Sequence, residues 1–194
     1  MVMDRALQII DRKSPLFPAQ PAQRLGTEAP DRLWAIGSSD LLSIPKTALF
    51  CSKTCPGHAI LKAMEQAQKW RDKGRCIISG FHSPIEKECL DILLRGVQPI
   101  IICPARSLEG MRIPKTWQEG IAAGRILLLS PFDFSQRRLT ATLSDQRNRL
   151  VAALADAVYF AHVTSGGKIA RLAEQVSRWG LTGSAVPGLT EAPG

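Results

Sequence analysis

Two loops in this sequence carry the residue types that bind phosphate groups. Each follows a short apolar segment and precedes a helical pattern, and they contain Ser52 and Lys53 in the first loop and Ser165, Gly166, Gly167 and Lys168 in the second. An ammonium group, hydroxyl groups and the backbone N–H groups of a glycine turn can bind one anion together at a helix N-terminus. Both loops are therefore predicted to bind phosphate, although the hydroxyls of the first loop would serve equally well as helix caps.

A third loop begins with Ser79 at the end of a predicted strand and continues with Gly80, Phe81 and His82. Glycine lets a ligand approach the backbone closely, and an aromatic or imidazole ring can stack on a nucleic-acid base. A histidine could also transfer protons, but the sequence gives His82 no identified nucleophile as a partner. We therefore expect this loop to bind a ligand rather than to catalyse a reaction.

The densest basic segment spans residues 136–150, where four arginines accompany a single acid. The arginines are Arg137, Arg138, Arg147 and Arg149, and Asn148 separates the last two. Guanidinium groups match the geometry of phosphate oxygens. On a helix, residues 147 and 149 point in different directions, so we expect one of them to pair internally and the other to face the ligand.

Short apolar segments alternate with longer helical patterns along the chain. The predicted strands are residues 33–36, 47–51, 76–79, 99–103, 126–129 and 157–161, and the predicted helices are residues 58–73, 85–94, 140–154 and 168–179. Strands made almost wholly of apolar residues favour a parallel sheet that is covered on both faces. The sequence therefore predicts an α/β fold with a doubly wound, mostly parallel sheet. Ligands of such sheets bind at the carboxyl ends of the strands, where the loops above are expected.

The length of the chain and its prolines predict one packed domain with an extension at each end. The chain has 194 residues, and four prolines interrupt residues 14–30, which should therefore form an irregular arm. We expect residues 1–30 to form an N-terminal segment that includes this arm. Residues 31–188 should form the packed domain, and residues 189–194 a flexible tail.

Composition excludes several classes of protein. No apolar stretch approaches the ~20 residues of a membrane-spanning helix, and residues 1–13 lack the apolar run and cleavage site of a secretory signal. We therefore expect a cytoplasmic protein without membrane contact, whose five cysteines are reduced. Cys51 and Cys55 have the spacing of half a zinc site, but the other half is missing, so we expect no metal and no other cofactor.

The balance of charges points to an anionic partner. Lysine and arginine number 25 against 17 aspartate and glutamate residues, which gives a formal net charge of +8. A basic surface concentrates polyanions electrostatically. Charge alone does not distinguish nucleic acid, a small nucleotide and a merely solvated basic surface.

The order of these segments resembles the DprA/Smf family of DNA-processing proteins over residues 32–188. The similar segments are Leu33-Trp34-Ala35-Ile36-Gly37, Ser52-Lys53, Ser79-Gly80 with Ile85-Glu86, Arg147-Asn148-Arg149, Ser165-Gly166 and Ala185-Val186-Pro187-Gly188. Cys51, Lys53 and residues 82–84 depart from the family pattern, so the chain looks like a divergent member. The resemblance implies an extended Rossmann-like fold that binds single-stranded DNA in a basic pocket. For the transformation proteins of the family it also implies transfer of that strand to a RecA-type recombinase, and we expect no winged-helix domain after residue 188.

Three functions are consistent with these patterns. In the leading hypothesis the protein binds single-stranded nucleic acid without catalysis, and Lys53, Arg147, Arg149 and Lys168 neutralise its phosphates while a ring of the third loop stacks on a base. The alternative is a small-nucleotide sensor or nucleotide-processing protein of the same fold superfamily. Hydrolysis of a nucleotide glycosidic bond is disfavoured, because residues 165–171 lack the third glycine, the threonine and the acid of the loop that such hydrolases carry. A partner-binding protein without a ligand is the third hypothesis, and formation of a homodimer is left open.

Overall fold

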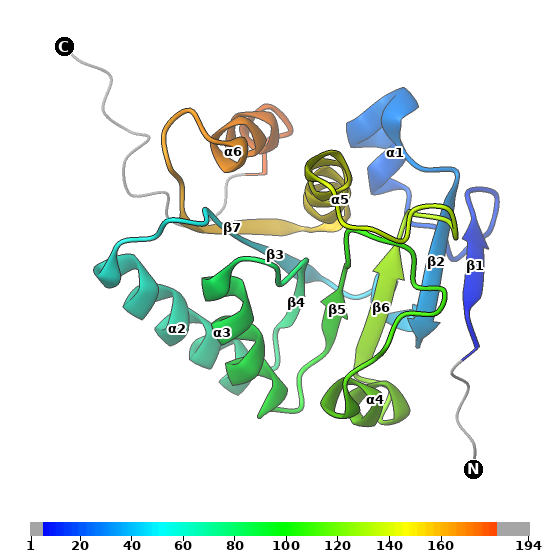
Figure 1. Cartoon of the computed structure of the whole chain (residues 1–194), viewed down its shortest axis with the longest axis horizontal. Coiled ribbons are helices and arrows are strands. Elements are labelled where there is room, and N and C mark those ends of the chain that lie inside the picture. The colour runs from blue at the N-terminus through cyan, green and yellow to red at the C-terminus, as the bar shows by residue number, and fades with distance from the viewer. Residues whose placement is uncertain (1–5, 182–194) are drawn as a thin grey trace.

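A seven-stranded sheet in the order β1-β2-β6-β5-β4-β3-β7 runs through the middle of the molecule (Figure 1). The computed structural model describes residues 6–181. The strands are β1 (Gln8–Asp11), β2 (Arg32–Gly37), β3 (Lys46–Cys51), β4 (Cys76–Ser79), β5 (Ile100–Ile102), β6 (Ile126–Ser130) and β7 (Ala157–His162). Strands β3 to β7 pair in parallel, whereas β2 pairs antiparallel with both β1 and β6. The predicted α/β fold with a mostly parallel sheet is confirmed.

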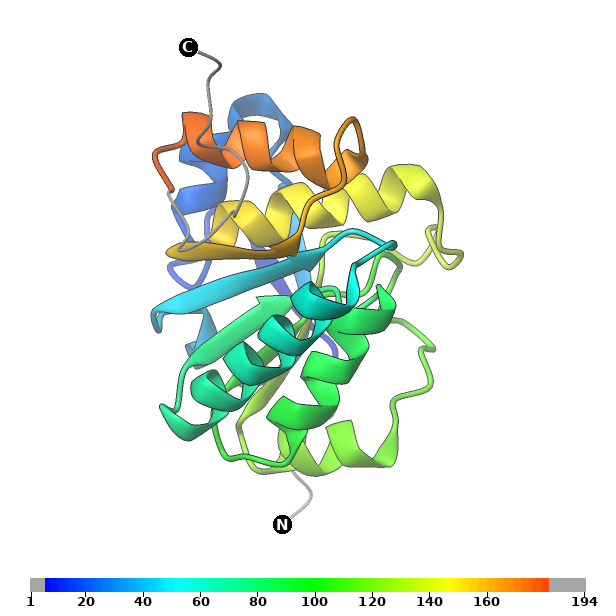
Figure 2. The same ribbon diagram turned by 90° about the vertical axis from the view of Figure 1, so that its left-hand side faces the viewer.

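Helices cover both faces of the sheet (Figures 1 and 2). One face carries α1 (Gln20–Leu25), α5 (Ala141–Leu154) and α6 (Lys168–Arg178), and the other carries α2 (Gly57–Asp72), α3 (Pro84–Leu94) and α4 (Lys115–Ala122). Val151 and Leu172 pack with Leu127 on the first face, and Ala67 and Cys89 pack with Ile77 on the second. The apolar strands are thus buried on both sides, as a parallel sheet requires.

The strand order reverses beside β3. After β3 the chain crosses to β4 on one side, while β7 pairs with β3 on the other side. The loops that follow β3 and β7 therefore leave the sheet next to each other. Such a reversal is where ligands bind in open parallel sheets.

The structure corrects the expectation of an irregular arm over residues 14–30. Helix α1 forms there, with Pro21 in its first turn, where a missing N–H group does no harm. Leu25 and Ala29 are buried against Ala153 of α5. Strand β1 pairs with β2, so the sheet also begins before residue 31. The tail over residues 189–194 and the Ala185-Val186-Pro187-Gly188 segment lie outside the described residues.

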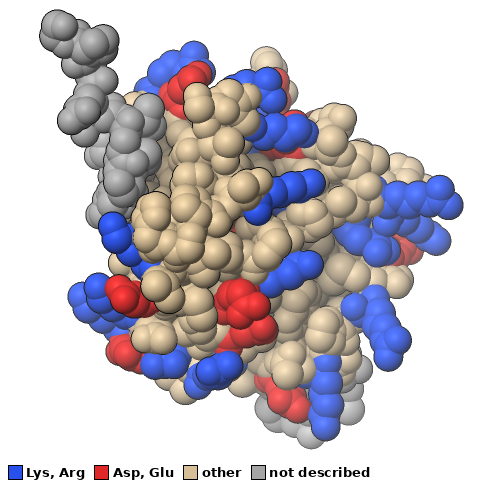
Figure 3. Space-filling view, turned by 60° about the vertical axis from the view of Figure 1, so that its left-hand side comes forward, with Lys and Arg blue, Asp and Glu red and all other residues tan. Residues whose placement is uncertain are grey.

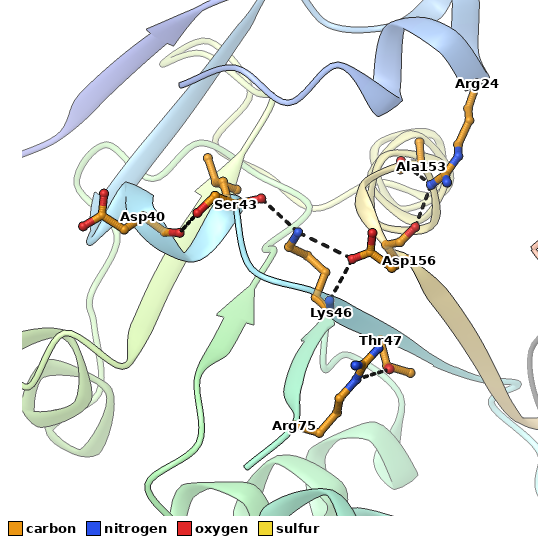
Figure 4. Close-up of polar contacts among 10 residues, drawn as sticks. Arg24, Asp40, Ser43, Lys46, Thr47, Arg75, Ala153 and Asp156 are labelled. Atoms are coloured by element: carbon orange, nitrogen blue, oxygen red, sulfur yellow. Dashed lines mark hydrogen bonds and ion pairs between the residues drawn. The ribbon is translucent and has the colours of Figure 1, made fainter. Parts of the chain in front are cut away.

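A polar cluster joins the starts of β3 and β7, at the end of these strands opposite the predicted ligand loops (Figure 4). The Lys46 ammonium is buried, donates to the Leu42 carbonyl at 2.9 Å and lies 3.9 Å from the Asp156 carboxylate. That carboxylate also accepts the Lys46 backbone N–H at 2.8 Å. Burial lowers the pKa of Lys46, and the charge of Asp156 opposes this shift. Arg24 closes the cluster by donating to the carbonyls of Ala153 and Ala155 at the end of α5.

Candidate functional site

Two of the predicted phosphate loops touch at the reversal of strand order. The Ser52 backbone N–H donates to the His162 carbonyl at 3.0 Å, and the Ser52 hydroxyl accepts the Thr164 N–H at 2.9 Å. The Thr164 hydroxyl in turn donates to the Thr54 carbonyl at 3.5 Å. The loop with Lys53 and the glycine loop that precedes Lys168 are therefore held side by side.

Glu86 attaches the third loop to the first. One oxygen of its carboxylate accepts the Cys51 N–H at 3.0 Å, and the other accepts the N–H groups of His82 at 2.8 Å and Ser83 at 3.1 Å. The Ser83 hydroxyl accepts the Glu86 N–H and completes a capping box at the start of α3. This buried carboxylate therefore fixes the backbone of two loops. The S-x-x-E spacing of a capping box is the sequence signal for it.

Ser79 and Phe81 are structural residues. The Ser79 hydroxyl donates to the Leu49 carbonyl at 2.8 Å and accepts the Phe81 N–H at 3.1 Å, and both side chains are buried. Phe81 has a φ of 46°, which turns the chain sharply after β4 and directs the ring into the core with Ile85. A ring that stacks on a base needs an exposed face. The expectation that Phe81 could stack on a base is therefore wrong. Of the two predicted stacking residues in this loop, His82 is the exposed one.

Arg147 is also internal. Its side chain is buried beside Gly80, Nη1 donates to the Cys103 carbonyl at 2.6 Å, and Nε donates to the Asn148 side chain at 2.7 Å. Burial lowers the pKa of Arg147, and the charge of Glu86 opposes this shift. The expected internal pairing of one arginine is confirmed for Arg147, which therefore cannot neutralise a phosphate at the surface in this conformation.

Arg149 and Lys168 line one groove between α5 and α6. Their neighbours in this groove are Asp145, Asn148, Arg171, Leu172 and Gln175. Arg149 is ion-paired with Glu28, and Lys168 donates to the Asp145 carboxylate at 2.8 Å and to the Ala141 carbonyl at 3.3 Å. Both ion pairs are at the surface, where they contribute little stability, so a phosphate can compete for these cations.

Lys53, His82 and Lys87 form what we call the loop cation cluster. All three side chains are exposed. The pKa of His82 is lowered first by partial burial and then by the charges of Arg147, Lys87 and Lys53, while Glu86 opposes the shift. A histidine whose neighbours are mostly cations marks a region of positive potential. Sequence reasoning missed Lys87, although its place in the first turn of α3, directly after the third loop, was a usable signal.

Further arginines lie on the loops after β5 and β6. The Ser107 N–H donates to the Gln136 carbonyl and joins the two loops, and the hydroxyl of Ser130, the last residue of β6, donates to the Arg106 carbonyl. The loops contain Arg106, Arg137 and Arg138. The Nε atom of Arg106 is buried and has no hydrogen-bond partner among residues 6–181. Sequence reasoning also missed Arg106, because a single arginine after a strand carries no pattern. Figure 3 shows Lys and Arg side chains along the right-hand side of one face, with few acidic side chains among them.

Two further findings concern metal ligands and membrane spans in the described part of the chain. Within residues 6–181, no group of three or more histidine, cysteine, aspartate or glutamate side chains is arranged to hold a metal ion. No helix in that part is long and apolar enough to cross a membrane.

Comparison with known proteins places these features in a family. The DNA recombination-mediator protein A family matches residues 8–187. The structure is similar to DNA processing protein A (DprA) from Streptococcus pneumoniae, with a TM-score of 0.72 and 21% identity over 96% of this chain and 67% of that chain. It is also similar to DNA processing protein A from Helicobacter pylori, whose single-stranded DNA binding mode has been described, with a TM-score of 0.71 and 20% identity over 92% of this chain and 80% of that chain. No protein with curated annotation matches the sequence significantly. Because the family match spans most of the chain and the fold agrees with two DprA structures, this chain belongs to the DNA recombination-mediator protein A family.

Proposed function

We propose that this protein binds single-stranded DNA across the carboxyl edge of its sheet and acts in DNA processing. The observation that carries the proposal is the hydrogen-bonded junction of the Ser52 and Thr164 loops beside the loop cation cluster. Membership of the family supports the choice of ligand. The described single-stranded DNA binding of the Helicobacter pylori protein is consistent with it.

The roles proposed for the individual site residues differ from those expected from the sequence. Lys53 is exposed and has no hydrogen bond or ion pair with a described residue, so it is free to neutralise a phosphate. Lys168 and Arg149 would exchange a surface carboxylate for a phosphate. Arg147 would act indirectly by supporting the loops. His82 would stack on a base or, when protonated, pair with a phosphate.

The proposal includes no catalytic step. The Glu86 carboxylate, which is the acid nearest to His82, already accepts three backbone N–H groups. The Ser83 hydroxyl caps α3 through the Glu86 N–H. Neither group is therefore arranged as a nucleophile or a general base for a bound nucleotide.

The direct test is the anisotropy of a labelled oligo(dT) strand titrated with the full chain at several salt concentrations. Three or four neutralised phosphates predict a slope of about −2 to −3 in log K against log salt, from about −0.7 per phosphate of a single strand. Unlabelled oligo(dT) should displace the probe, and mononucleotides at the same phosphate concentration should not. Displacement by a mononucleotide alone would instead support the small-nucleotide sensor.

The loop cation cluster can be tested by one matched pair of variants. Lys53→Ala should make the salt slope shallower by about 0.7, because one phosphate contact is lost. Lys69→Ala removes an exposed lysine from the last turn of α2, at the end of that helix away from the cluster, and should leave the slope unchanged. Equal slopes for the two variants would remove Lys53 from the binding surface.

Two wider elements of the proposal come from the family resemblance. We propose that the bound strand passes to a RecA-type recombinase, and that both proteins meet in the cytoplasm. Filament assembly by a purified recombinase on a strand already covered by single-strand binding protein measures this step. Addition of the chain should shorten the delay before assembly, and an unchanged delay would argue against a recombinase partner.

A further inference from the structure

The loop after β6 exposes an aromatic ring at the carboxyl edge of the sheet. The Phe134 side chain is 64% exposed, and it is the one aromatic residue among the large exposed apolar side chains of residues 6–181. Single exposed aliphatic side chains are normal on a protein surface. Aromatic rings, in contrast, are enriched where a surface contacts a partner. Phe134 is therefore a candidate contact residue.

A hydrogen-bonded turn holds Phe134 in place. The Asp133 carboxylate accepts the Ser135 N–H at 2.9 Å and the Ser135 hydroxyl at 2.5 Å, and the Asp133 carbonyl accepts the Gln136 N–H at 3.1 Å. The Phe134 carbonyl accepts a hydrogen bond from Arg137 Nε at 3.1 Å. The backbone on both sides of the ring is thus fixed before a ligand arrives, which lowers the entropic cost of binding.

The loop is also anchored to the rest of the protein on either side of the ring. Phe132 is buried and packs with Leu143 of α5. The Gln136 carbonyl accepts the Ser107 N–H of the loop after β5 at 2.8 Å. The exposure of Phe134 is therefore a consequence of how this loop folds, because the residues two positions before and after it are both held.

Cations without acidic partners follow the ring. Arg137 and Arg138 are both exposed. Neither forms an ion pair with an acid in the described part of the chain. The acid of this loop, Asp133, is engaged by Ser135 inside the turn. An exposed ring next to unpaired arginines matches the flat bases and the phosphates of a single strand.

The loop after β6 adjoins the proposed DNA site. One cavity is lined by Phe132 and Gln136 of this loop and by Arg149 of α5. Arg149 also lines the groove between α5 and α6, together with Lys168. The wall formed by Arg149 thus connects the groove with the loop that carries the ring.

We propose that Phe134 is a stacking platform for one base of single-stranded DNA, and that Arg137 and Arg138 bind phosphates next to that base. This inference rests on the proposed function, and it extends the DNA site to the loops after β5 and β6. Every base has a flat π face, so stacking on a ring contributes affinity without a strong base preference.

Variants of Phe134 test the stacking by anisotropy titration of labelled oligo(dT). Phe134→Ala and Phe134→Leu should each weaken binding by about fivefold or more, because neither side chain has a π face. Phe134→Trp should bind at least as tightly as the wild type. The salt slope should stay the same in all three variants, since no phosphate contact is lost. Wild-type affinity in Phe134→Leu would overturn the proposal.

Val97→Ala is the matched control for these titrations. Val97 is an exposed apolar residue just before β5, at the opposite edge of the sheet, so its substitution should leave the affinity unchanged. Urea unfolding should give all the variants the stability of the wild type, because both side chains are exposed. An equal loss of affinity in Val97→Ala and Phe134→Ala would overturn a specific role for the ring.

Photocrosslinking locates the base. An oligo(dT) strand in which 5-iodouracil replaces one thymine is irradiated in complex with the full chain, and the tryptic peptides are mapped by mass spectrometry. The adduct should be on the peptide of residues 126–137, at Phe134, and Phe134→Ala should remove it. Adducts on other peptides alone, from a chain that binds oligo(dT), would overturn the proposal and leave the proposed function intact. Absence of oligo(dT) binding by the wild type would instead overturn the proposed function, and this inference with it.

A second copy of the chain is the competing occupant of this surface. Sedimentation velocity of the DNA-free wild type and Phe134→Ala should give the same distribution of species. A wild-type dimer that dissociates in Phe134→Ala, with unchanged affinity for oligo(dT), would overturn the proposal in favour of a contact between copies.

Discussion

Gly80 and Arg147 share one space: the position that a Cβ atom would take at Gly80 is filled by the guanidinium group of Arg147. The arginine comes from α5, passes beside the loop after β4 and reaches the Cys103 carbonyl at the end of β5. One buried side chain thus supports the carboxyl ends of two neighbouring strands. The glycine is required because of this arginine rather than because of a ligand.

Substitution of Gly80 should therefore destabilise the protein. Gly80→Ala forces either the loop or the Arg147 side chain to move, and overpacking of this kind costs about 1–3 kcal/mol. Urea unfolding followed by tryptophan fluorescence measures the loss in the free energy of unfolding. Gly57→Ala is the matched control, since a Cβ atom there meets no neighbour and the residue begins α2. Equal stability of the two variants would mean that Arg147 is not held against Gly80.

Substitutions of Arg147 and Arg149 should have different effects on stability and on DNA binding, although only one residue separates the two arginines. Arg147→Met leaves the buried Cys103 carbonyl without its donor, which costs about 1–3 kcal/mol of stability. Arg149→Met removes an exposed ion pair with Glu28 and should cost less stability. In oligonucleotide titrations, Arg149→Met should make the salt slope shallower, whereas Arg147→Met should leave the slope unchanged. A shallower slope for Arg147→Met would place its guanidinium on the DNA.

DNA binding should strengthen as the pH falls, through His82. Its pKa lies below 6.5 in the free protein, because partial burial and neighbouring cations disfavour the imidazolium. A bound phosphate raises the pKa of His82, so the complex takes up a proton. Between the pKa of His82 in the free protein and its pKa in the complex, the affinity rises by up to about tenfold for each unit that the pH falls. Anisotropy titrations from pH 7.5 to pH 5.5 measure this rise. His82→Gln should remove it, and an identical rise in this variant would assign the proton to another group.

Protonation of His82 should lower the stability of the free protein, although it should strengthen DNA binding. Without DNA, the unfolded chain binds the His82 proton more tightly than the folded chain does. The contribution of His82 to the free energy of unfolding is therefore complete above pH 6.5 and declines as the pH falls toward the folded pKa. Urea unfolding of the wild type and His82→Gln at each pH isolates this contribution. A difference between the two proteins that grows in favour of the wild type at low pH would contradict it.

Substitutions of the buried Lys46 and of its partner Asp156, at the opposite end of the sheet, should have unequal effects on stability. Lys46→Met keeps most of the side-chain volume and removes a buried charge, so the change in stability should be neutral or favourable. Asp156→Ala leaves the Lys46 ammonium without its counter-charge and the Lys46 N–H without its acceptor, which should cost about 1–3 kcal/mol. Thermal unfolding of both variants is sufficient as a measurement. A larger loss for Lys46→Met would show that the ammonium itself stabilises the fold.

The sequence by itself determined the repeating strand and helix order. Unbroken apolar strands and helix-period segments bury their side chains only in an α/β sheet covered on both faces, so all six predicted strands are present. Strand β1 and helices α1 and α4 were missed, because they are short and their stability comes from packing on the sheet rather than from a local pattern. The loops of the candidate site could likewise be predicted from their glycines, hydroxyls and lysines.

Only the tertiary structure decided which of the site residues face solvent. Arg147, Ser79 and Phe81 are residue types that are common in ligand sites, yet each is buried and supports the loops from inside the protein. Lys87 in the first turn of α3 and Arg106 on the loop after β5 were not among the predicted residues, yet both are at the carboxyl ends of the parallel strands. The physical reason is that spacing along the chain sets the direction of a side chain only within one helix or strand. Its burial and its partners depend on the elements that pack against it, and those come from distant parts of the chain.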